Sequence, residues 1–317
     1  MVQQGKPCSF RGTGFFWYLI KKLALKREGL LLMKKEMYGY LGPVGTFSEQ
    51  AALKYFNDES KLLPLRSFNE IFEKLQTGEI SRGVIPIENS LEGAVKLCMD
   101  LLYSSSYVVV VDEIILPVKH YLMASPGTKI DNIKEIYSIS QIIGQTNTFI
   151  NQNLPDTAIN YTGSSAQAAE IIKGKSGKAM IGSKRISNLY GLETLAEEIQ
   201  DMSNNYTRFF VLANKLDIKD EFPDMDKEYK TSIICAPEVN EAGVLYNILA
   251  EFKREDINLT RIESRPTKRQ LGEYIFYIDF EGHQKNRHVR VALEGIEKKS
   301  VFFKILGSYV KGEIETS

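Results

Sequence analysis

Three times in its first two-thirds, the chain repeats one pattern: a short apolar strand is expected to end in a polar turn, and the turn opens a helix. In open α/β sheets, turns of this kind gather at the carboxyl ends of the strands, where ligands bind. The repetition therefore predicts an α/β fold whose ligand site is built from several turns. The polar residues at the three turns are Thr46, Asn89, Ser90, Ser164 and Ser165.

The first and third turns carry capping-box sequences. Thr46-Phe47-Ser48-Glu49 follows an expected strand at 37–41, and Ser164 stands three residues before Gln167 on an alanine-rich segment. Helix N-termini present unpaired N–H groups and partial positive charge. Both turns are therefore suited to a carboxylate or a phosphate.

The second turn, Asn89-Ser90, follows an apolar run at 83–87. Either side chain is a favourable helix cap, so we expect it to cap a helix that runs on to residue 102. Farther along, helices are expected at 131–136 and 142–150, with a strand at 136–140 between them. His120 lies on an expected strand and is interpreted as a structural histidine.

One stretch combines polar chemistry with a buried strand: Asn204-Asn205-Tyr206-Thr207-Arg208-Phe209-Phe210-Val211-Leu212. Its first half offers a hydroxyl, a guanidinium and two amides, and its second half is aromatic and β-branched. Consecutive side chains of a strand point to opposite faces. Thr207 and Arg208 are therefore not expected to contact the same ligand.

The composition limits the classes of cofactor and partner. Lys+Arg and Asp+Glu each number 40 among 317 residues, so no charge excess favours nucleic acid or a membrane. The three cysteines and three histidines have no metal-ligand spacing, and neither GxGxxG nor a Walker loop is present. We therefore expect no metal, no cofactor, no nucleic acid and no membrane partner, and a reducing, cytoplasmic location.

The ends of the chain differ from its centre. Residues 1–36 contain an apolar run that Lys21-Lys22 interrupts, too short to span a bilayer, and we expect a dispensable extension there, with membrane association as the alternative. Residues 217–229 are charged and predict a linker. The strand and helix order at 230–311 is βαββαβ, which predicts a small ferredoxin-like α+β module.

Five segments, taken in order, closely resemble the prephenate dehydratase family. Three precede the linker: Gly42-Pro43-x-Gly45-Thr46-Phe47-Ser48-Glu49, Pro86-Ile87-Glu88-Asn89-Ser90-x-Glu92-Gly93 and Asn205-x-Thr207-Arg208-Phe209. Two follow it, Gly243-Val244-Leu245 and Glu263-Ser264-Arg265-Pro266, and are similar to the signatures of the family's ACT regulatory domain. Five such motifs in sequence are specific, and the resemblance as a whole runs from about residue 38 to residue 309.

The resemblance implies a catalytic domain at 37–216, made of two α/β subdomains similar to a periplasmic-binding-protein type II fold. The first subdomain would take 37–116 and 193–216, and the second 117–192, with the active site in the cleft between them. The ACT domain would take 230–311. The resemblance also implies a homodimer or homotetramer, no cofactor, and allosteric inhibition by L-phenylalanine.

The implied reaction converts prephenate to phenylpyruvate with loss of carbon dioxide and water. The family assigns a donor role to the threonine that matches Thr207, and because a hydroxyl is a poor acid we interpret it as a positioned donor that stabilises the departing oxygen. Asn205 and Glu88 are expected to orient it or to relay protons. Arg208 would either bind a substrate carboxylate or brace the subdomain. The expected substrate-binding residues are Thr46, Asn89, Ser90, Ser164, Ser165, Arg208 and Phe209.

The implied phenylalanine site comprises Gly243, Val244, Leu245, Glu263, Ser264, Arg265 and Pro266. The chain departs from the family pattern at Ser138-Ile139-Ser140-Gln141, where a Ser-His-Pro-Gln run is usual, and at Ala242 and Val244. Two other functions are open: an arogenate dehydratase, and a catalytically silent amino-acid sensor, against which Thr207 and Glu88-Asn89-Ser90 argue. A fusion with chorismate mutase is not expected, because 36 residues are too few for its helical domain.

Overall fold

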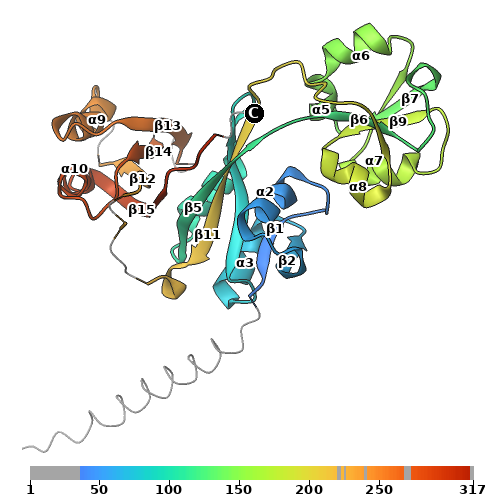
Figure 1. Ribbon diagram of the computed structural model, residues 1–317. Coiled ribbons are helices and arrows are strands. Elements are labelled where there is room, and N and C mark those ends of the chain that lie inside the picture. The colour runs from blue at the N-terminus through green and yellow to red at the C-terminus, as the bar shows by residue number, and fades with distance from the viewer. Residues whose placement is uncertain (1–35, 220–222, 225, 239–240, 268–272, 315–317) are drawn as a thin grey trace, which may run out of the picture. The chain divides into compact units, whose positions relative to one another are not determined.

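The computed structural model describes residues 36–219, 223–224, 226–238, 241–267 and 273–314 of the chain (Figure 1). The expected extension at 1–36, except for Glu36, lies outside these residues, so its role stays a prediction. Across the described ranges, no helix is long and apolar enough to cross a membrane.

The first sheet joins strands from distant parts of the chain (Figure 1). Its order is β2-β1-β3-β11-β5, and the short β4 pairs with β3. β1 is parallel to β2 and β3, whereas β11 lies antiparallel between β3 and β5. The strands are β1 (Tyr38–Leu41), β2 (Leu62–Leu65), β3 (Arg82–Asn89), β4 (Gly93–Ala94), β5 (Val108–Pro117) and β11 (Tyr206–Asn214).

Helices cover both faces of this sheet, and strand alternation distributes the core between them. On one face, Ala51 and Ala52 of α2 pack with Phe209. On the other, the hydrophobic faces of α3 and α4 pack with Phe210. The predicted buried strand is confirmed, since Phe209 and Phe210 are each only 1% exposed. The helices are α2 (Phe47–Phe56), η1 (Glu59–Lys61), α3 (Phe68–Thr77) and α4 (Lys96–Ser104).

The second sheet has the order β10-β6-β9-β7-β8. Its central strands carry buried apolar residues; Ile136, Met180 and Ile181, for example, are 0% exposed. The strands are β6 (Tyr121–Ala124), β7 (Glu135–Ser138), β8 (Ala158–Tyr161), β9 (Lys178–Gly182) and β10 (Glu193–Ala196). The helices are η2 (Ile130–Asn132), α5 (Ser140–Gly144), α6 (Asn147–Asn153), α7 (Ser165–Ile172) and α8 (Lys184–Tyr190).

Three sequence predictions for this region are wrong in detail. The helix expected at 131–136 is only the turn η2, because Ile136 lies in the buried strand β7. The helix expected at 142–150 is interrupted between α5 and α6, where the Thr146 hydroxyl donates to the carbonyl of Ile142. The return to the first subdomain was expected at 193, yet β10 pairs with β6 of the second sheet, and the chain rejoins the first sheet only at β11.

The third sheet follows the linker and is entirely antiparallel, in the order β13-β14-β12-β15. The predicted βαββαβ order is confirmed. Figure 1 shows α9 and α10 together beside this sheet, and their apolar side chains share one core with it. The elements are η3 (Lys215–Asp217), β12 (Tyr229–Pro237), α9 (Val244–Arg254), β13 (Leu259–Pro266), β14 (Tyr274–Glu281), α10 (Arg287–Glu297) and β15 (Ser300–Val310).

The two faces of the third sheet have different neighbours. Ile233 and Cys235 of β12 point into the core shared with α9 and α10. Ile234 and Ala236, between and after them in the sequence, point instead into the core that includes α3 and α4 of the first region. The sheet is therefore buried on both sides, and its second face meets the region that carries β3 and β11.

Candidate active site

A cleft of about 430 Å³ lies where the first and second sheets present their polar turns. Its volume is in the range of small-molecule sites. Much of its wall is apolar, including Phe47 and Phe209, as is usual where a few polar groups orient a ligand. The polar side chains that line it belong to Thr46, Ser48, Asn89, Glu92, His120, Gln141, Gln145, Ser164, Ser165 and Thr207.

Two of the three predicted helix N-termini open onto this cleft. The Thr46 side chain caps α2 by accepting from the Glu49 backbone N–H, and Ser164 caps α7 by accepting from Gln167 in the same way. In return, the Glu49 and Gln167 side chains accept from the backbone N–H groups of the glycines before each cap. Both capping boxes are confirmed, and each provides a positively polarised helix end to an anion.

The second turn has a different structure from the one expected. No helix begins at Asn89 or Ser90, because β3 continues through Asn89 and the chain then forms β4. The Asn89 Oδ1 atom accepts from the backbone N–H groups of Leu91 and Glu92, which makes a side-chain turn. Helix α4 begins only at Lys96 and has no side-chain cap.

Asn89 instead orients the side chain at the centre of the site. β3 and β11 pair so that Asn89 faces Thr207, and Asn89 Nδ2 lies 3.0 Å from Thr207 Oγ1. An amide nitrogen only donates, so the Thr207 oxygen accepts this bond. Among the described residues, no protein acceptor takes the Thr207 hydroxyl proton. Thr207 therefore lines the cleft with a fixed oxygen and a proton available to a ligand.

Asn205 and Ser90 support this arrangement from beside the cleft. Asn205 is only 1% exposed; its Oδ1 accepts from Asn89 and its Nδ2 donates to Gln145 Oε1, at 2.8 and 3.1 Å. The Ser90 hydroxyl bonds the backbone of Asn204 and Tyr206 across the strand ends. The predicted role of Asn205 as an orienting residue agrees with these contacts. Ser90 braces the turn rather than lining the cleft.

Arg208 and Glu88 lie on the opposite face of the same strands, and the substrate-binding and relay roles expected for them are wrong. Arg208 is 7% exposed. Its guanidinium pairs with Glu88, Glu113 and Asp279 at 2.9, 2.6 and 2.6 Å. Glu88 also pairs with Arg261, at 2.7 Å. Strand alternation sends these side chains away from Thr207 and toward the third sheet.

This cluster keeps its charges although it is buried. Burial by itself disfavours the charged form of Arg208, but Asp279 and the other carboxylates raise its pKa well above the ordinary value. Burial would likewise raise the pKa of Asp279, yet Arg208 and Arg261 hold that pKa below the ordinary range. Arg208 therefore braces β11 against the third sheet, which was one of its two expected roles.

His120, Glu92 and Gln145 were not assigned to the site from the sequence, but all three line the cleft. His120 is 1% exposed, and burial lowers its pKa while its hydrogen bond to Gln145 opposes the shift. Gln145 contacts both His120 and Asn205. One signal was available in the sequence: Glu92 belongs to the same motif as Asn89. His120 and Gln145 belong to none of the recognised motifs and carry no comparable signal.

The residues expected to bind phenylalanine lie at the N-terminus of α9 and at the end of β13. Leu245 packs against the core of the third sheet, and Gly243 precedes α9 with φ of 85°, a conformation that favours glycine. Arg265 pairs with Asp100 of α4 at 2.8 Å. A role for these residues in binding phenylalanine stays a prediction.

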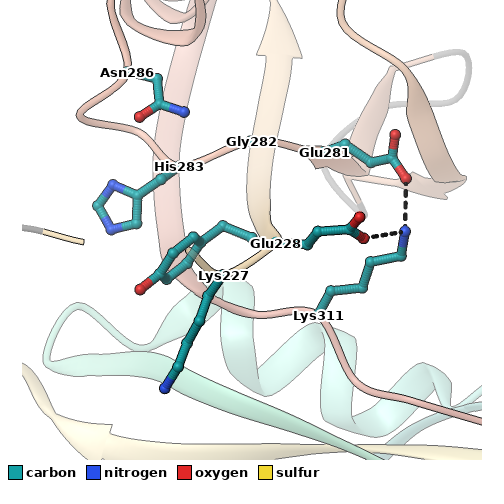
Figure 2. Close-up of a pocket in the computed structure, with 8 residues that line it drawn as sticks. Lys227, Glu228, Glu281, Gly282, His283, Asn286 and Lys311 are labelled. Carbon is teal, nitrogen blue, oxygen red and sulfur yellow. Dashed lines mark hydrogen bonds and ion pairs between the residues drawn. The ribbon is translucent and has the colours of Figure 1, made fainter. Parts of the chain in front are cut away.

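A second cavity, of about 300 Å³, lies at the edge of the third sheet near the end of β15. Figure 2 shows Lys311 between the carboxylates of Glu228 and Glu281, and the ion pairs measure 3.0 and 3.1 Å. The cavity is also lined by Lys227, so its two lysines are balanced by the carboxylates of Glu228 and Glu281.

The geometry agrees with three comparisons. The family model for prephenate dehydratase matches residues 38–217. A bifunctional chorismate mutase/prephenate dehydratase of Aquifex aeolicus is 36% identical over 286 residues, covering 90% of this chain and 76% of the relative. Prephenate dehydratase of Methanocaldococcus jannaschii is 36% identical over 275 residues, covering 85% and 96%.

Solved structures and a plant relative complete the comparison. Prephenate dehydratase of Arthrobacter aurescens, in complex with L-Phe, has a TM-score of 0.78 at 30% identity and covers 87% of this chain and 90% of its own. An Arabidopsis thaliana protein named arogenate dehydratase/prephenate dehydratase 1 is 36% identical over 290 residues, covering 87% and 72%. The architecture predicted from the sequence, a periplasmic-binding-protein type II-like catalytic region followed by an ACT domain, is that of these dehydratases. The chain belongs to the prephenate dehydratase family.

Proposed function

We propose that the cleft converts prephenate to phenylpyruvate, with Thr207 as the hydrogen-bond donor to the departing ring hydroxyl. The observation that carries this proposal is the bond from Asn89 Nδ2 to Thr207 Oγ1. It fixes the oxygen and leaves the hydroxyl proton directed to a ligand. Donors held in place before the reaction stabilise developing negative charge without reorganising, and this is worth several kcal/mol in barrier height.

The two capped helices would hold the substrate carboxylates. Prephenate carries one carboxylate on the ring and one on its side chain, and α2 and α7 each open onto the cleft with unpaired N–H groups. No lysine or arginine lines this cleft among the described residues. Helix ends carry only a partial positive charge, so they would oppose the loss of the ring carboxylate as carbon dioxide less than a full positive charge would.

Arogenate differs from prephenate by an amino group in place of the side-chain keto group. Dehydratases named for each substrate are similarly related to this chain. The cleft offers Glu92 as a carboxylate that an ammonium group would favour, although Glu92 already accepts from Gln145. We take prephenate as the primary substrate and arogenate as the alternative.

The third sheet with α9 and α10 would act as the regulatory domain and bind L-phenylalanine, as in the relative solved with that ligand. We divide the chain accordingly into a catalytic domain at 37–216, a linker at 217–229 and a regulatory domain at 230–311. A homodimer or homotetramer in the cytoplasm is part of the same proposal. Support for regulation comes from Arg208, which pairs with Asp279 of the third sheet while its neighbour Thr207 lines the cleft.

The first experiment measures phenylpyruvate formed from prephenate and phenylalanine formed from arogenate by the purified chain, each with and without L-phenylalanine. We expect turnover of prephenate that L-phenylalanine suppresses. Preferential turnover of arogenate would make arogenate the primary substrate in place of prephenate and would leave the proposed role of Thr207 unchanged. Turnover of neither, with L-phenylalanine still bound in calorimetry, would identify a sensor and overturn the proposal.

A further inference from the structure

The proposed reaction consumes a proton. Prephenate enters as a dianion and leaves as the phenylpyruvate monoanion, carbon dioxide and water, so one proton must join the departing hydroxide. The carbon–carbon bond to the ring carboxylate breaks, its electron pair enters the ring, and the carbon–oxygen bond breaks with its pair on oxygen. A threonine hydroxyl stabilises this oxygen but is a poor source of the proton itself.

Two side chains that line the cleft in the described part of the chain have an acid–base group that titrates below pH 8 in ordinary surroundings, Glu92 and His120. Glu92 Oε1 accepts from Gln145 Nε2 at 3.2 Å. That bond directs Glu92 toward Gln145. His120 is the group whose side chain ordinarily binds and releases a proton near neutral pH.

The hydrogen bonds around Gln145 define which nitrogen of His120 carries a proton. Because the Gln145 amide nitrogen donates to Glu92, its oxygen faces His120 Nε2, at 2.8 Å. An amide oxygen only accepts, so Nε2 must be the donor and the neutral ring keeps its lone pair on Nδ1. Nδ1 is buried and has no hydrogen-bond partner among the described residues.

We propose, resting on the function above, that His120 is the general acid of this cleft: it takes up a proton at Nδ1 when the dianion binds and passes it to the departing hydroxide as water forms. The imidazolium returns to the neutral ring, and the charges balance. Both side chains line the cleft. Thr207 orients the departing oxygen, and Nδ1 of His120, which is buried in the free protein, must come into contact with that oxygen when the ligand binds. Gln145 links both, because it contacts His120 directly and reaches Thr207 through Asn205 and Asn89.

The surroundings of His120 suit this cycle. The ring of Phe47 from α2 meets it edge-on at 5.9 Å, and Gln145 follows α5. Nearby charges are Glu92 beyond Gln145, and Lys119 next in the chain, which is paired with Glu198 at 2.7 Å. Burial lowers the pKa of His120, so the free enzyme holds the neutral ring at pH 7. Two negative charges on a bound substrate would favour the protonated ring and raise that pKa.

The test is the pH dependence of turnover in His120→Gln, whose amide preserves a donor in place of Nε2 but does not titrate. In the wild-type protein kcat/KM should fall about tenfold per pH unit from below pH ~6.5 upward, because burial lowers the pKa of His120 in the free protein, while kcat falls only at higher pH. In His120→Gln, kcat should be lower by about 100-fold or more, and neither kcat nor kcat/KM should show the fall with rising pH that the wild-type protein shows. His283→Gln, another buried histidine, is the matched control and should keep the wild-type profile.

A second measurement follows the proton directly. Prephenate binding to Thr207→Ala is measured by calorimetry at pH 7.5 in buffers of different ionisation enthalpy. Uptake of about one proton is expected, and the double variant with His120→Gln should take up none. An unchanged kcat with an unchanged pH dependence in His120→Gln would overturn the role of His120. So would equal proton uptake on prephenate binding by Thr207→Ala and by the double variant. Such a result leaves the proposed function intact, since that stands or falls with wild-type turnover of prephenate.

Discussion

The two faces of β11 differ in how their polar groups are satisfied. On one face Thr207 joins a neutral network of hydroxyl and amide groups that lines an open cleft. On the other face, one residue later, Arg208 joins a buried cluster with Glu113 and Asp279. The first face keeps hydrogen-bonding capacity for a ligand, whereas the second directs its charges to protein partners.

The contacts of Arg208 explain why this arginine is not expected to bind the substrate. A guanidinium in the cleft would bind the carboxylate that must leave as carbon dioxide and would oppose its departure. Neutral donors and helix ends, which carry at most partial charges, oppose that departure less. The charged face instead joins three strands, β3, β11 and β14, through Glu88, Arg208 and Asp279. The residue that lines the cleft and the residue that pairs with the third sheet are thus neighbours in the chain.

The largest expected effect is on the charged face. Arg208→Met keeps a long side chain but leaves Glu113 and Asp279 buried without their main partner, and should lower the free energy of unfolding by about 3–5 kcal/mol. Urea unfolding followed by circular dichroism measures this loss. Lys184→Met is the control, since it removes a solvent-exposed pair with Glu197 and should cost about 1 kcal/mol or less. Equal losses of unfolding free energy in both variants would contradict a stabilising role for the buried ion pairs of Arg208.

A smaller effect is expected on the neutral face, in rate rather than in stability. Thr207→Ala removes the oriented hydroxyl and should lower kcat by about 10²–10³-fold, with the urea midpoint nearly unchanged. Thr207→Ser retains the hydroxyl and should recover most of the rate. Steady-state phenylpyruvate formation measures both variants. If the alanine variant kept the wild-type kcat, the cleft-facing hydroxyl would have no part in the reaction.

The smallest expected effect lies at the far end of β13. Arg265→Ala should leave kcat without effector unchanged and raise the L-phenylalanine concentration for half-inhibition by about tenfold, or about 1.4 kcal/mol. Asp100→Asn keeps Arg265 but removes its 2.8 Å ion pair, so it separates ligand binding from contact with α4. Inhibition curves and calorimetric titration of L-phenylalanine provide the measurement. Undiminished inhibition in Arg265→Ala would remove that residue from the regulatory site.

The capping boxes and strand alternation were readable from the sequence because they depend on near neighbours. Thr46 and Glu49, or Ser164 and Gln167, form their bonds within one helical turn. The prediction of a helix cap at the second turn was wrong because it, too, relied only on near neighbours. Asn89 has the composition of a helix cap, but β11 lies beside it and offers Thr207 as a partner 118 positions away. A pattern of neighbouring residues does not indicate a contact with a residue so distant in the chain.

The α/β class, the βαββαβ module and the opposite directions of Thr207 and Arg208 could be predicted from the sequence, because periodicity and capping act over a few residues. The partner of each side chain depends instead on how distant segments fold together. The tertiary structure paired Arg208 with Asp279 across 71 positions and brought His120 to Gln145 across 25. Such contacts depend on the order of the strands and on which segments pack against them. The same residue type can therefore line a cleft at one position and lie in a core at another.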